Sequence, residues 1–130
     1  VTLEVHPVGE PLPPVPLDAA RLKQVLLNLI RNAIEALPGG GRVLVECGLV
    51  EGEARLMVHD TGAGLPKDLD IFQLFVTNKP RGTGLGLPIA HQIVLEHGGE
   101  ISARNRPGGG ASFTVTLPVP KAKAQPKVRP

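Results

Sequence analysis

The chain has 130 residues, enough for one domain with a hydrophobic core and too few for two. Hydrophobic residues make up 42% and charged residues 20% of the chain, as in globular proteins. No apolar run approaches the ~18 residues that a membrane span needs, and no secretory signal precedes the fold, so we expect a cytoplasmic domain without membrane contact. A single cysteine excludes an internal disulfide and a zinc cluster.

The positive charge is concentrated at the end of the sequence. The formal net charge is +2, yet residues 121–130 contain four basic residues and no acidic one, so residues 1–120 have a formal charge of −2. We therefore predict a folded domain over 1–120 and a basic, Pro- and Lys-rich disordered linker over 121–130. The body is slightly acidic and has no Trp or Tyr, which argues against a nucleic-acid binder.

The first elements in chain order are a strand and a long helix. Residues 1–5 alternate weakly and predict an edge strand. Asp18 is a favourable helix N-cap, and apolar residues then recur at i, i+3, i+4 and i+7 as far as Leu37. This spacing predicts an amphipathic helix of about 20 residues, ended by the Pro- and Gly-rich residues 38–41.

A hairpin and a long loop follow. Apolar residues alternate from Val43 to Leu49, and residues 56–60 alternate again on the returning strand, with a turn at 51–53. Cys47 is interpreted as a small core residue. Residues 61–83 are rich in Gly, Pro and polar residues and predict a loop.

The last elements are a helix and a closing hairpin. The helix is predicted to start near Leu85–Pro88 and to end at Gly98 and Gly99 in a left-handed cap. The hairpin crosses residues 105–110. Because the strands are linked by hairpins, we expect a mixed, mostly antiparallel sheet with both helices on one face, in a two-layer α/β sandwich.

One stripe of the first helix is polar. At about 100° per residue, Gln24, Asn28, Asn32 and Glu35 lie on one side of the apolar face. They are either polar residues that flank a buried stripe or oxygen ligands for a hard cation such as Mg²⁺, which takes a few protein oxygens and keeps waters and phosphates at its other positions.

Two glycine-containing segments carry further chemistry. Asp60, with Gly62 and Gly64, forms either an Asx-type turn or a loop in which a carboxylate accepts the amino group of a base. Residues 82–87 expose backbone N–H groups at a helix start and are suited to phosphates. They are neither a dinucleotide fingerprint, because Leu87 stands where the third glycine belongs, nor a P-loop, because Gly-Lys-Ser/Thr is absent.

In this order the segments resemble the ATP-binding catalytic domain of bacterial sensor histidine kinases, a member of the superfamily that includes gyrase B, Hsp90 and MutL. Arg31 before Asn32 is similar to the nitrogen-regulator subgroup. The matching segments are residues 24–33 (asparagine box), 60–64 (first glycine box), 71–79 (phenylalanine box), 82–87 (second glycine box) and 110–118 (last strand).

The resemblance implies a Bergerat fold and a role for each matching residue. Asn32, assisted by Asn28, would coordinate Mg²⁺, and Asp60 would accept the adenine amino group in a pocket kept open by Gly62 and Gly64. Residues 65–81 would form a lid. The other residues implied to contact nucleotide are Phe75, Thr77, Lys79, Gly82, Thr83, Gly84, Leu85, Gly86 and Leu87, with Lys79 also counted as catalytic beside Asn28 and Asn32.

By the same resemblance the chain would bind Mg–ATP and transfer the γ-phosphoryl group to a histidine on a separate dimerisation domain. No acceptor helix pair is found in this sequence, so we expect a monomeric catalytic domain whose partners are that domain and a downstream response regulator. Two alternatives stay open: a protein-serine kinase of the same superfamily, similar to an anti-sigma factor, and a catalytically silent nucleotide-binding or docking module.

Overall fold

The structure, a computed structural model, describes residues 1–11, 19–65 and 83–119, without the side chains of residues 19 and 83–87. The predicted linker at 121–130 and most of the predicted loop at 61–83 lie outside these residues. The elements are β1 (Thr2–Pro7), α1 (Ala19–Glu35), β2 (Arg42–Val50), β3 (Glu53–Asp60), α3 (Thr83–Glu96), β4 (Glu100–Asn105) and β5 (Ala111–Pro118).

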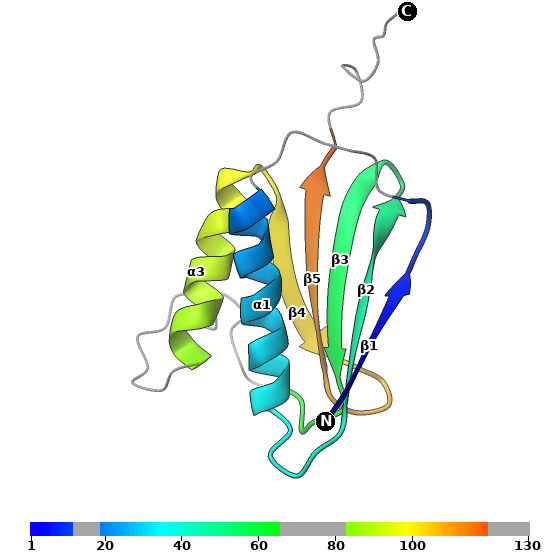
Figure 1. The fold of residues 1–130 in the computed structure, drawn as a ribbon, viewed down its shortest axis with the longest axis vertical. Coiled ribbons are helices and arrows are strands. Elements are labelled where there is room, and N and C mark those ends of the chain that lie inside the picture. Colours follow the sequence, from blue (N-terminus) through cyan, green and yellow to red (C-terminus); the bar gives the residue numbers. More distant parts are fainter. Residues whose placement is uncertain (12–18, 66–82, 120–130) are drawn as a thin grey trace, which may run out of the picture.

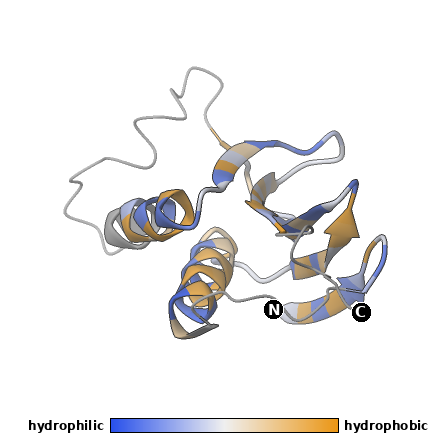
Figure 2. Ribbon diagram, turned by 90° about the horizontal axis from the view of Figure 1, so that it is seen from above, coloured by the Kyte–Doolittle hydropathy of each residue, from blue (hydrophilic) through white to orange (hydrophobic). Residues whose placement is uncertain are grey.

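The strands form one sheet in the order β1-β2-β3-β5-β4. β1 pairs with β2 in parallel, and the other three pairs are antiparallel, so the predicted mixed sheet is confirmed. Both helices lie on the same face of this sheet (Figures 1 and 2), which gives the predicted two-layer sandwich. β1 is the edge strand that the sequence predicts, and it runs two residues further, to Pro7.

The core lies between the helices and the facing side of the sheet. Val25, Leu29 and Ala33 of α1 are at most 1% exposed, as the helical spacing predicts. Ile34, which was predicted on the same apolar face, is 42% exposed. It lies about 100° round the helix from Ala33, at the margin of the buried stripe. The other buried apolar residues are Leu37, Val43, Val45, Ala54, Val58, Ala90, Ile93, Val94, Ala103, Ala111, Phe113, Val115 and Leu117.

The predicted alternation of β2 holds only in its first half. Val43 and Val45 are buried, but Cys47 is only partly buried and is not the core residue that the sequence suggested. Gly48 is buried instead. The chain beyond β1 stays beside β2 there: Val8 N–H donates to Cys47 O, Glu10 pairs with Leu49, and a Cβ at Gly48 would lie 1.7 Å from the carbonyl oxygen of Val8. A contact with residues distant in sequence therefore buries Gly48, which the local alternation places on the other face.

The start of α3 differs from the prediction by two residues. The helix begins at Thr83 rather than near Leu85–Pro88, so Pro88 lies inside it. Pro88 is the sixth residue of the helix, so it lacks the N–H that would bond the carbonyl of residue 84, and the helix tolerates this loss close to its start. The helix ends as predicted: Gly98 has a φ of 77°, and Gly99 N–H donates to Val94 O at 3.0 Å. These contacts form a Schellman cap.

An ion pair joins the start of α1 to the end of α3. Arg21 Nη2 of α1 lies 2.5 Å from Glu96 Oε1 of α3. Both side chains are about half exposed, so this pair contributes little to stability. None of the described helices has the length and apolar character that crossing a membrane requires.

Candidate functional site

Asp60 is the most deeply buried charged residue in the described part of the chain, with an exposure of 2%. Its Oδ1 accepts hydrogen bonds from the backbone N–H of Gly62 at 2.9 Å and of Ala111 at 3.3 Å. The Gly62 bond is the Asx-type turn that the sequence left open. Both bonds fall on one oxygen, so within the described residues Oδ2 has no donor. The carboxylate is thus oriented by the backbone and retains one acceptor oxygen.

Around this carboxylate, two glycines lie very close to backbone carbonyl groups of other segments. A Cβ at Gly62 would lie 2.5 Å from the carbonyl oxygen of Ala36, just beyond α1, and a Cβ at Gly110 would lie 1.9 Å from that of Asp60. Gly110 also has a φ of 91°, which L side chains rarely adopt. Arg106 Nη1 donates to the same Asp60 carbonyl at 3.1 Å. The loop before β5 therefore packs directly against the end of β3.

Replacing Gly110 by alanine is expected to destabilise the domain by at least ~2 kcal/mol, because the new Cβ meets backbone in a strained conformation. The matched control is Gly108→Ala in the same loop. A Cβ at Gly108 meets nothing within 4 Å, so we expect a change within ~0.5 kcal/mol. Urea unfolding of the two variants measures the difference, and equal stability would contradict this account of the loop.

The segment that follows Gly64 is anchored by Asn105 at the end of β4. Asn105 Oδ1 accepts the N–H of Leu65 at 2.6 Å, and its Nδ2 donates to the Leu65 carbonyl at 3.1 Å. Gly64 has a φ of 87°, and a Cβ there would lie 2.6 Å from Asn105 Oδ1. The predicted lid thus starts from a fixed point.

The polar stripe of α1 faces the same region. Asn28 and Asn32 are partly buried, whereas Gln24 and Glu35 are exposed. Asn32 lies one turn before Ala36, whose carbonyl closely approaches Gly62. The stripe and the Asp60 loop therefore meet at the end of the domain where α1 and β3 finish and α3 begins (Figure 1). Two amide oxygens one turn apart suit a cation such as Mg²⁺.

The remaining predicted contacts are only partly described. Phe75, Thr77, Lys79 and Gly82 lie outside the described residues. Residues 83–87 form the first turn of α3, where backbone N–H groups have no partner within the helix and can bind anions. In the described ranges, no group of three or more His, Cys, Asp or Glu side chains could hold a metal ion.

Sequence reasoning missed Asn105, Arg106 and the N–H of Ala111 as groups that position the site. The sequence predicted their hairpin, but not its contacts with Asp60 and Leu65, because those contacts join residues 40 or more positions apart. Only the strand order β3-β5-β4 brings them together.

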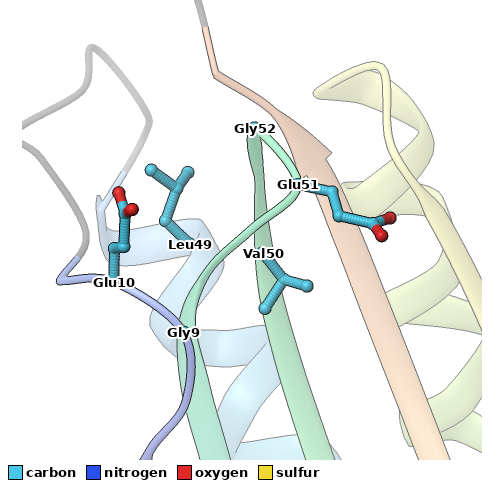
Figure 3. A pocket seen from close by; sticks show the side chains of 6 residues that line it. All are labelled: Gly9, Glu10, Leu49, Val50, Glu51 and Gly52. Atoms are coloured by element: carbon cyan, nitrogen blue, oxygen red, sulfur yellow. The ribbon is translucent and has the colours of Figure 1, made fainter.

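Among the described residues, one pocket lies away from this site and another borders it. One, of about 330 Å³, lies at the opposite end of β3 beside the β2–β3 turn (Figure 3). The other, of about 110 Å³, is lined by Arg42, Leu44, Thr61 and Arg106.

Arg42 Nη2 lies 3.1 Å from both carboxylate oxygens of Glu4. Hydrogen bonds from His6 and from Arg42 lower the pKa of the Glu4 carboxyl below its ordinary value.

Comparison with known proteins assigns the family. Residues 17–121 match the family described as histidine kinase-, DNA gyrase B- and HSP90-like ATPase, and the chain belongs to it. The chain is 41% identical over 121 residues to the sensor histidine kinase ZraS of Escherichia coli (strain K12). That match covers 92% of this chain and 26% of ZraS. The chain therefore spans about a quarter of that relative.

Solved structures agree with this assignment. The nucleotide-free catalytic domain of histidine kinase ThkA has a TM-score of 0.77 and 35% identity, over 90% of this chain and 78% of that one. ThkA is also known in complex with the response regulator TrrA (TM-score 0.74, 33% identity, 93% and 35% covered). Full-length ShkA in complex with AMPPNP has a TM-score of 0.75 and 32% identity, over 90% and 26% of the two chains. The predicted fold and family are confirmed.

Proposed function

We propose that this chain is the catalytic domain of a sensor histidine kinase, which binds Mg–ATP and transfers the γ-phosphoryl group to a histidine of a separate dimerisation domain. The observation that carries the proposal is the buried Asp60 carboxylate, whose Oδ1 is held by two backbone N–H groups. Its Oδ2 is left to accept the exocyclic amino group of adenine. The nucleotide analogue bound to ShkA supports this choice of ligand.

The other roles follow from chemistry around the proposed phosphates. The unpaired N–H groups at the start of α3, with Gly82, Gly84 and Gly86, would bind phosphate oxygens, and Lys79 would add a positive charge. Mg²⁺, when bound, would neutralise phosphate charge, and the amide oxygens of Asn28 and Asn32 fit it. The chain then acts by positioning the γ-phosphoryl group and stabilising charge, which is what phosphoryl transfer requires.

We further propose that residues 1–120 form this catalytic domain and that residues 121–130 are a linker. The isolated domain is expected to be a monomer in the cytoplasm, where ATP is available. Its partners would be the dimerisation domain of the same kinase and a response regulator, with no nucleic acid and no membrane surface. The response-regulator complex of ThkA supports the last partner.

The test mixes this domain with the dimerisation domain of its parent kinase and γ-labelled ATP. We expect label on the acceptor domain only when both domains and Mg²⁺ are present, and we expect that label to be lost in acid, as phosphohistidine is. Label that survives acid would indicate the serine-kinase alternative. Tight ATP binding without any transfer would indicate the silent module.

A further inference from the structure

Three polar side chains form a hydrogen-bonded chain on the sheet face that the helices leave uncovered. His59 Nδ1 lies 2.6 Å from Ser112 Oγ, and His59 Nε2 lies 2.9 Å from Glu46 Oε1. The chain joins β2, β3 and β5. His59 and Ser112 alternate with Val58, Asp60 and Phe113 of the core side, so they lie on the opposite face of the sheet. We call these three residues the outer-face chain.

When the His59 ring is neutral, only one placement of its hydrogen satisfies both contacts. A carboxylate can only accept, so His59 Nε2 carries the hydrogen and donates to Glu46. The unprotonated Nδ1 then accepts the hydroxyl hydrogen of Ser112. The His59 side chain is 15% exposed and that of Glu46 is 27% exposed, so these bonds are partly shielded from water.

The outer-face chain lies directly behind the proposed adenine site. His59–Ser112 is the last residue pair of the β3–β5 ladder. The next residue on each strand belongs to the site: Asp60 follows His59, and Ala111, whose N–H donates to Asp60 Oδ1, precedes Ser112. Beyond the ladder these strand ends are joined by that 3.3 Å bond and by Arg106. The side-chain contact at the last pair therefore adds to the backbone ladder at the point where the ladder ends.

We propose that Glu46, His59 and Ser112 are positioning residues for nucleotide binding: they hold the ends of β3 and β5 together and so keep the Asp60 carboxylate aimed at the ligand. This inference rests on the proposed function, because it concerns the affinity of that same site. The chain is not a hydrolytic Ser–His–acid centre, since Ser112 is only 6% exposed and gives a substrate little access to its hydroxyl.

The test measures AMPPNP and adenosine binding to Glu46→Ala, Glu46→Gln and Ser112→Ala by calorimetry. Glu46→Ala removes the acceptor of His59, whereas Glu46→Gln retains an amide oxygen in its place. We expect Glu46→Ala and Ser112→Ala to weaken both ligands about 3- to 10-fold and Glu46→Gln to restore most of the affinity, because a net hydrogen bond is worth ~0.5–1.5 kcal/mol. Inorganic triphosphate, which lacks adenine, should bind all variants as it binds the wild type.

The matched control is Thr116→Ala. Thr116 lies on the same strand and the same parity as Ser112, at the other end of β5, paired with Glu100. It should leave the affinity for AMPPNP unchanged. A role in sheet stability alone would weaken the binding of triphosphate and adenosine equally, or leave the binding of both unchanged.

A second test is the nitrogen NMR shifts of His59 at about pH 8, where an ordinary histidine is neutral. They should show the hydrogen on Nε2, and a hydrogen on Nδ1 would overturn the proposed arrangement.

The outcomes separate this inference from the proposed function. If Asp60→Asn weakens adenosine but Glu46→Ala does not, the positioning role is wrong and the adenine site stands. If the wild type binds neither ligand, the proposed function fails first. Should Ser112→Ala unfold, the comparison of Glu46→Ala with Glu46→Gln still decides, because the Glu46 side chain is 27% exposed and its replacement leaves the core intact.

Discussion

Replacing Asp60 by asparagine is expected to weaken ATP binding by about 10- to 100-fold, the loss that corresponds to a charge-assisted hydrogen bond of ~1.5–3 kcal/mol. The asparagine carbonyl oxygen can still accept the N–H groups of Gly62 and Ala111, which now bond Oδ1. Its amide NH₂ then stands in the place of Oδ2. A donor would face the donor amino group of adenine, so the ligand loses its acceptor while the loop keeps its shape.

Calorimetric titration with AMPPNP measures this effect. Thermal unfolding should show that the variant stays folded, since both backbone bonds are retained. Glu100→Gln is the control: it makes the same carboxylate-to-amide change at an exposed position of β4 and should bind as the wild type does. Unchanged affinity in folded Asp60→Asn would reject the adenine assignment.

Replacing Asn32 by alanine is expected to abolish the magnesium-dependent increase in ATP affinity and to lower phosphoryl transfer by about 100-fold, because charge neutralisation by the metal provides several kcal/mol. Asn32 is partly buried on α1, one turn after Asn28. Alanine has the higher helix propensity, so α1 itself should not be weakened. The loss then reports on the amide oxygen and not on the helix.

ATP titrations of the Asn32→Ala variant with and without Mg²⁺ measure this effect. Gln24→Ala provides the control, because Gln24 lies on the same stripe but is exposed near the start of α1. It should keep the full difference between the two titrations. If Asn32→Ala also keeps it, the metal role of this residue is wrong.

The elements that sequence predicted well are those whose signal is local. The spacing from Leu22 to Ala33 depends on one period of one helix, although that helix ends at Glu35 and not at the predicted Leu37. The cap at Gly98 depends on one left-handed residue. The errors arose where another segment intervenes. Gly48 of β2 is buried because the residues after β1 pack against it, whereas Cys47 is only partly buried, and no local pattern predicts that contact.

The sequence by itself determined the order of the elements, the mostly antiparallel sheet and the identity of the residues proposed to bind nucleotide. The first two follow from local patterning and short hairpin connections, whereas the residue roles come from the resemblance of the motif segments to the histidine kinase family. Only the tertiary structure decided how the Asp60 carboxylate is held, that its Oδ1 accepts both backbone bonds, and that Arg106 and Asn105 fix the segments on either side of it. Those contacts join segments far apart in the chain, and strand order and register, which are global properties, bring them together.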